Sequence, residues 1–322
     1  DSYFRDVGEP TYKWDKSIQP MFIGAYTSMS DVKKGYRQLE NALYATEKLA
    51  AAVSCQGLMP YPHEAFEQAE RGMLFAAFHD TLAGTISRTP EKEALQSIGF
   101  ALEILERVRT RAFYAIASRE APAKPDSLPV FVYNPHPYPV SGIWECEYTL
   151  ADYNWEDCTY RPLLYRGEQE IDCQSERESG NVPVEYRKRI AFAAPLAPMA
   201  MERFDLFFEK MPVEKRAAVP LSEPFTFDND RMQVEIDPQT GLIRRYRVEG
   251  RDMAANSFGT LAVYADSVDP WGMLIKRFGE QIGSFRLMTP EETAVFAGVK
   301  AQALAPVRIV EDGAVRTVVE VC

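Results

Sequence analysis

The chain has 322 residues, of which 46% are hydrophobic and 26% charged, an ordinary composition for a globular protein. This length suggests two domains and allows a core large enough to need no disulfide bonds. The net charge is −11 without a basic stripe, which argues against a nucleic-acid partner. No run of about 18 apolar residues occurs, so we expect no membrane span.

Helical periodicity dominates the first third of the chain. Apolar residues at steps of three and four predict three helices, at about residues 31–54, 62–84 and 90–116. Ser28 and Asp31 suggest a capping box at the start of the first helix. Short connections between helices of this length predict an antiparallel three-helix bundle.

The period changes after a proline-rich linker at residues 121–129. Apolar and polar residues alternate at 144–150 and 204–208, as in strands with one buried face. Turn sequences at 237–241 and at Asp312–Gly313 each separate two strand patterns. The fold class that we predict is α+β, with the helical bundle followed by an antiparallel β-sandwich-type region.

These patterns give domain limits for most of the chain. We place the bundle at 28–120, the linker at 121–129 and the β region at 130–322. The last residues form an apolar strand pattern that stops at Cys322, so we expect a truncated β region that continues in a longer protein.

The five cysteines are irregularly spaced and form no CxxC pair. This usage is typical of free thiols in a reducing compartment, so we expect a cytoplasmic protein.

The sequence contains three histidines, and only one has neighbours that suggest chemistry. His63 and His136 lie in a first helical turn and in a proline-rich turn, and structural roles are the simpler interpretation of both. His79 stands beside Asp80 in FHDTLAGT (78–85), where a helix is expected to end at a glycine. An imidazole and a carboxylate together can bind a metal or hydroxyl groups. A histidine with a purely structural role at a helix end is the alternative.

A second candidate is the loop DSVDPWGM, residues 266–273. Tryptophan faces stack on sugars, and carboxylates accept hydrogen bonds from sugar hydroxyls. Asp269 and Trp271 are therefore candidate substrate-binding residues. The alternative is a proline turn with a packed tryptophan.

Four segments, in order, resemble glycoside hydrolase family 38, the class II α-mannosidases. FHDTLAGT looks like the His-Asp motif of that family. The other three are 24–50, which resembles the opening of its central helical domain, and 130–145 and 225–253, which resemble successive β segments.

The resemblance implies a zinc enzyme whose catalytic barrel precedes these domains. Residues 1–27 would then be the tail end of that barrel, or a linker. His79 matches a zinc ligand of the family, and Asp80 matches an aspartate that contacts hydroxyls of the bound mannose. The nucleophile and the general acid of the family lie in the barrel, so we expect no catalytic residue of either kind in this chain. Phe78 departs from the second histidine of many eukaryotic members, which favours a microbial-type or cytosolic protein and leaves the linkage specificity open.

The resemblance therefore implies part of a zinc-dependent retaining α-mannosidase that is inactive alone. Its partners would be a mannose-containing oligosaccharide and its own barrel, and a homo-oligomer is left open. In the isolated chain the zinc can be absent. Two other functions remain open: a non-catalytic carbohydrate-binding or accessory protein that lacks the barrel, and an unrelated structural scaffold.

Overall fold

The computed structural model describes most of the chain, in the form of two compact units. The first unit comprises 1–50, 61–109 and 264–282, and the second comprises 51–60, 110–263 and 283–322. The described residues are 2–8, 12, 14–15, 22–151, 158–178, 180, 184, 186–212, 218–254, 256–266, 268–269, 271–272 and 278–322. The domain limits drawn from the sequence stay a prediction.

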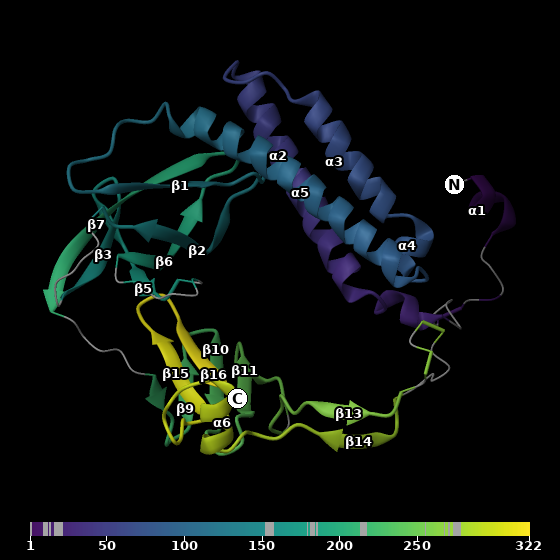
Figure 1. Cartoon of the computed structure of the whole chain (residues 1–322), viewed down its shortest axis with the longest axis vertical. Coiled ribbons are helices and arrows are strands. Elements are labelled where there is room, and N and C mark those ends of the chain that lie inside the picture. Colours follow the sequence, from purple (N-terminus) through teal and green to yellow (C-terminus); the bar gives the residue numbers. More distant parts are fainter. Residues whose placement is uncertain are drawn as a thin grey trace. The chain divides into compact units, whose positions relative to one another are not determined.

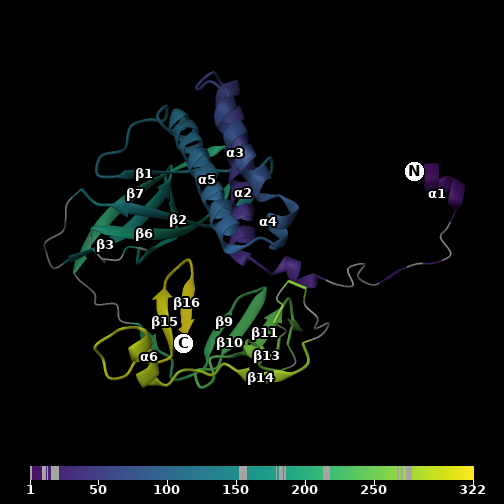
Figure 2. The same ribbon diagram turned by 45° about the vertical axis from the view of Figure 1, so that its right-hand side comes forward.

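Helices form the N-terminal part of the chain, in the order α1 (Ser2–Val7), η1 (Ile23–Tyr26), α2 (Ser30–Cys55), α3 (His63–Ala76), α4 (His79–Ala83) and α5 (Arg88–Ala117). Figures 1 and 2 both show α2, α3 and α5 side by side. Glycines in α2 and α3 allow these helices to approach α5 closely. A Cβ atom added to Gly35 would lie 3.3 Å from the Ile98 side chain, and one added to Gly72 would lie 3.1 Å from Ala101. Both α2 and α3 therefore pack closely against α5.

The second predicted helix is not continuous, which corrects the expectation of one helix over 62–84. It ends at Ala76, and Phe78 adopts an extended conformation with ψ of 138° before α4 begins at His79. The apolar pattern runs across this break, but Leu74, Phe75 and Phe78 are exposed. His79 therefore opens a separate one-turn helix rather than closing a long one.

The first strands after the helices, between Leu128 and Pro212, form two antiparallel sheets, which confirms the predicted α+β class. One sheet has the order β1-β7-β3-β4 and the other β2-β6-β5. The Phe192 and Phe204 rings, one from each sheet, have centroids 5.0 Å apart in a core that both sheets supply. The strands are β1 (Leu128–Tyr133), β2 (Val140–Thr149), β3 (Cys158–Arg166), β4 (Gln169–Ile171), β5 (Cys173–Glu176), β6 (Arg187–Leu196) and β7 (Met201–Pro212).

Shorter strands follow, and they confirm both predicted turns. The turn at 237–241 joins β10 to the antiparallel strand β11, and the turn after Asp312 joins β15 to the antiparallel strand β16. Among the described residues of this region, for which we predicted an antiparallel β-sandwich-type fold, α6 (Pro290–Phe296) is helical. The strands are β8 (Val219–Pro220), β9 (Phe225–Asp228), β10 (Met232–Ile236), β11 (Ile243–Val248), β12 (Arg251–Asp252), β13 (Ala262–Tyr264), β14 (Gln281–Ser284), β15 (Val307–Asp312) and β16 (Thr317–Val321).

Within the described part of the chain, the helices are too short or too polar to cross a lipid bilayer.

Candidate functional site

The one-turn helix α4 carries the His-Asp pair and ends in a glycine-capped turn. Gly84 has φ of 85°, in the left-handed region that glycine tolerates best. The Gly84 N–H donates to the Thr81 carbonyl at 3.2 Å, and the Thr85 N–H donates to the Asp80 carbonyl at 3.0 Å. This pair of bonds is a Schellman motif, which satisfies two carbonyls that the helix end would otherwise leave free.

His79 and Asp80 both project from this turn into solvent. The side chain of His79 is 78% exposed and that of Asp80 is 50% exposed. His79 Nε2 lies 3.4 Å from Asp80 Oδ2, which is too long for a strong hydrogen bond. The imidazole therefore points away from the helical core, as the zinc-ligand hypothesis requires, and its nitrogens are accessible.

A hydroxyl group from the same turn holds the Asp80 carboxylate. Thr85 Oγ1 donates to Asp80 Oδ1 at 2.9 Å and lies 3.3 Å from the Asp80 carbonyl oxygen. Asp80 Oδ2 takes no part in this contact. One oxygen of the carboxylate is thus anchored, while the other faces His79. Thr85 belongs to the FHDTLAGT motif, but its role could not be foreseen from the residue type alone.

Two side chains from remote segments donate to the last carbonyl of α4. Ser28 Oγ lies 2.8 Å from the Ala83 oxygen, and Trp271 Nε1 lies 3.0 Å from the same atom. Ser28 was expected to cap the first long helix. That expectation is wrong, because its hydroxyl donates to Ala83 and α2 begins two residues later.

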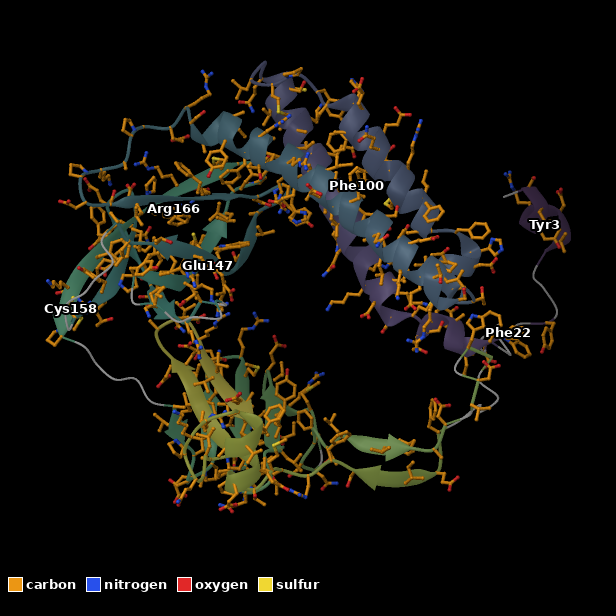
Figure 3. All side chains as sticks on the ribbon, in the orientation of Figure 1. Tyr3, Phe22, Phe100, Glu147, Cys158 and Arg166 are labelled. Atoms are coloured by element: carbon orange, nitrogen blue, oxygen red, sulfur yellow. The ribbon has the colours of Figure 1, made fainter. Side chains whose placement is uncertain are left out.

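The loop that contains Trp271 therefore reaches the turn that carries the His-Asp pair. Asp269 fixes the backbone at Trp271, because its Oδ1 accepts from the backbone N–H groups of Trp271 at 3.0 Å and Gly272 at 2.8 Å. The Phe22 ring packs on the Trp271 ring, with centroids 4.7 Å apart. Figure 3 labels Phe22 where the chain enters the helices. A role in sugar binding for Asp269 and Trp271 stays a prediction.

The other two histidines have local aromatic partners. His63, at the start of α3, contacts the Tyr61 ring edge-on with centroids 4.7 Å apart. His136 stacks on Tyr138 at 5.0 Å, and its backbone N–H donates to Asn134 Oδ1. These contacts are consistent with the structural roles that the sequence suggested.

A cavity of about 320 Å³ lies between α2 and α5. It is lined by Ala42, Thr46, Leu102, Glu103, Leu105, Glu106 and Arg109. None of the candidate functional residues belongs to this set.

Comparisons with known proteins give the class of the fold. The chain is similar to an alpha-mannosidase from Enterococcus faecalis V583, at 14% identity and a TM-score of 0.55, over 79% of this chain and 32% of that one. It is also similar to a protein in glycosyl hydrolase family 38 from Enterococcus faecalis, at 15% identity and a TM-score of 0.61, over 88% of this chain and 36% of that one. The chain thus spans about a third of the length of these structures. No curated protein matches it.

The family model described as the alpha mannosidase middle domain matches residues 21–116. This range contains α2, α3, α4, all of α5 except its last residue, and the whole FHDTLAGT motif. The helical part of the chain is therefore similar to the alpha mannosidase middle domain, and the chain as a whole shares its fold with part of the two Enterococcus faecalis structures.

Proposed function

We propose that this chain is part of a zinc-dependent retaining α-mannosidase that hydrolyses α-mannosidic bonds in mannose-containing glycans. In that enzyme it supplies one zinc ligand, His79, and one wall of the substrate pocket. The observation that carries the proposal is the exposed imidazole of His79 beside Asp80 on a glycine-capped turn of the middle domain.

The exposed imidazole of His79 fits a metal site that is shared with another part of the protein. Zinc accepts imidazole nitrogen and carboxylate oxygen ligands, and a catalytic site uses about three protein ligands and an open position. Among the residues that the structure describes, no cluster of three or more candidate ligands occurs, so His79 needs partners from elsewhere in the protein. Bound there, the metal ion would act as a Lewis acid and orient sugar hydroxyls.

Asp80 has the chemistry to bind and orient the sugar. Its carboxylate can accept hydrogen bonds from hydroxyl groups, and the bond from Thr85 fixes its direction. A retaining glycosidase also needs two carboxyl groups about 5 Å apart across the scissile bond. We assign the nucleophile and the general acid to the catalytic barrel that the family resemblance implies.

The surface beside His79 is suited to contact with such a barrel. Leu74, Phe75 and Phe78 are all exposed on the chain immediately before α4. Exposed apolar groups that lie close together are typical of interaction surfaces. We therefore propose the barrel of the same protein as the partner of this face.

Cytoplasmic location, homo-oligomerisation and sugar contacts of Asp269 and Trp271 stay predictions.

The proposal is tested with Asp80→Asn in the full-length protein that contains this chain. We expect kcat/KM for an aryl α-mannoside to fall about 10- to 100-fold, because hydrogen bonds to a charged group contribute about 1.5–3 kcal/mol. Zinc content should stay unchanged. Asp126→Asn is the control, because Asp126 is an exposed loop residue with a left-handed backbone that asparagine tolerates.

Equal activity of the Asp80 and Asp126 variants would contradict the role of Asp80. The isolated 322-residue chain should not hydrolyse the same substrate. Turnover by the isolated chain would show that the catalytic groups lie within it. A full-length protein without a barrel that still binds mannosides would instead support the carbohydrate-binding alternative.

A further inference from the structure

The Ala83 carbonyl joins three segments that are far apart in the sequence. It accepts one hydrogen bond from Ser28, which precedes α2, and one from Trp271, which lies between β13 and β14 in the sequence. All three residues belong to the same compact unit. Ala83 is only three residues after Asp80, so these two bonds act on the turn that carries the His-Asp pair.

A helix as short as α4 depends on such contacts. It has five residues, and helices of this length are not stable by themselves in water. Its N-terminal end has no side-chain cap, and Phe78 before it is extended. The direction of α4 is therefore set by the buried Thr81, by its C-terminal turn and by the two donors that hold the Ala83 carbonyl.

Trp271 is itself firmly placed. Asp269 Oδ1 accepts from the backbone N–H of Trp271, and the indole packs on the Phe22 ring. The indole N–H can donate only one hydrogen bond, and here it donates to Ala83 at 3.0 Å. The N–H edge of the half-buried Trp271 ring is thus bonded to the α4 turn, while its faces can pack against other side chains.

From these contacts we infer that Trp271 is a positioning residue for His79 and Asp80. Through its bond to the Ala83 carbonyl it fixes the direction in which α4 presents the imidazole and the carboxylate. The inference rests on the proposed function, because it concerns the geometry of the proposed ligand and sugar contact. Ser28 acts on the same oxygen and assists in the same way.

The test uses the full-length protein with Trp271→Phe, which keeps an aromatic ring against Phe22 but removes the N–H donor. Metal retention is measured by dialysis against a zinc chelator. The visible absorption of the cobalt(II)-loaded protein reports ligand geometry. Changes beyond the direct ligands commonly reduce metal affinity 10- to 100-fold, so we expect about a tenfold loss and a changed cobalt spectrum. Ser28→Ala should change both in the same direction.

Trp144→Phe is the matched control. Trp144 Nε1 also donates to a backbone carbonyl, that of Ala194 at 2.9 Å, but in the β region. This variant should lower the unfolding temperature without changing metal retention or the cobalt spectrum. Wild-type retention and spectrum in Trp271→Phe, or equal metal loss in Trp144→Phe, would overturn the inference.

His79→Ala separates the inference from the proposed function. If His79→Ala loses metal and Trp271→Phe does not, only the positioning role fails. If His79→Ala retains metal like the wild type, the proposed function fails and the positioning role fails with it.

Discussion

Gly84 combines two constraints at one residue. Its φ of 85° disfavours any other residue type, and a Cβ atom there would lie 2.3 Å from Ser28 Oγ. That hydroxyl cannot simply rotate away, because it donates to the Ala83 carbonyl at 2.8 Å. The glycine therefore allows both the turn and the approach of the segment before α2.

Gly84→Ala should consequently cost more stability than the backbone alone explains. The left-handed conformation costs an L-residue about 1–2 kcal/mol, and the Ser28 contact should add about 1–3 kcal/mol of overpacking. Gly57→Ala is the control, since Gly57 has φ of 69° but no atom within 4 Å of its added Cβ. Urea unfolding of both variants measures the difference. Equal losses of stability in the two variants would show that Ser28 moves aside without an energetic penalty.

At the scale of elements, a buried charged group connects β5 with Arg316, the residue before β16. The Glu176 side chain is 0% exposed and accepts hydrogen bonds from Arg316 Nε at 2.7 Å and Arg189 Nη2 at 2.9 Å. Burial alone would raise the pKa of Glu176, but the hydrogen bonds and charge of Arg316 lower it below its usual value. Gln174 Oε1 adds bonds from the backbone N–H groups of Val315 and Arg316, both at 2.9 Å.

Glu176→Gln should destabilise the β region by about 3 kcal/mol. Breaking a buried pair typically costs about 3–5 kcal/mol, and the partial exposure of both arginines places this case at the lower end. Glu209→Gln removes an exposed partner of Arg161 and should cost about 0–1 kcal/mol. Urea unfolding followed by circular dichroism measures both variants. A loss of stability below 1 kcal/mol in Glu176→Gln would contradict the stabilising role assigned to Glu176 and its two arginines.

The short helix α6 depends on a carboxylate in its first turn. Thr289 and Glu292 form a capping box, and Arg286 donates to both Glu292 carboxylate oxygens, at 2.8 and 2.7 Å. The hydrogen bonds from Arg286, followed by the backbone N–H of Thr289, lower the pKa of Glu292 to about 2. Because the folded pKa is depressed, this stabilisation is present above the unfolded pKa and is lost as the pH falls toward 2.

Wild type should therefore be more stable than Glu292→Gln at neutral pH. The difference should shrink as the pH falls from about 4.5, near the unfolded pKa of a glutamate, to about 2. Urea midpoints at several pH values measure this. Glu291→Gln removes the same charge from the same helical turn and should show a smaller effect. A pH-independent difference for Glu292→Gln would contradict the assignment.

At the scale of the whole molecule, hydrophobic period predicted the order of helices and strands. Period is a local property of the sequence, and it reports which face of an element is buried. It could not predict the break at Phe78, because the apolar pattern continues through residues that are exposed in the structure. Exposure of an apolar residue has no signature in a single sequence.

The candidate site was predictable only in part, for a related reason. His79 and Asp80 are adjacent in the sequence and stand out by residue type. The contacts of Ser28 and Trp271 with Ala83 join residues 55 and 188 positions apart. Neither segment carries a sequence signal that predicts its partner. Only the fold brings the two donors to the Ala83 carbonyl, which follows the His-Asp pair.

His79→Ala in the full-length protein tests whether His79 binds zinc. His63→Ala is the matched control, because His63 is also exposed and also opens a helix. With one direct ligand lost, zinc affinity should fall by more than the roughly 10- to 100-fold typical of indirect partners, and turnover of an aryl α-mannoside should fall with it. His63→Ala should keep both at the wild-type level. Wild-type zinc content and turnover in His79→Ala would contradict the account, and His79 would then be a structural residue of the α4 turn.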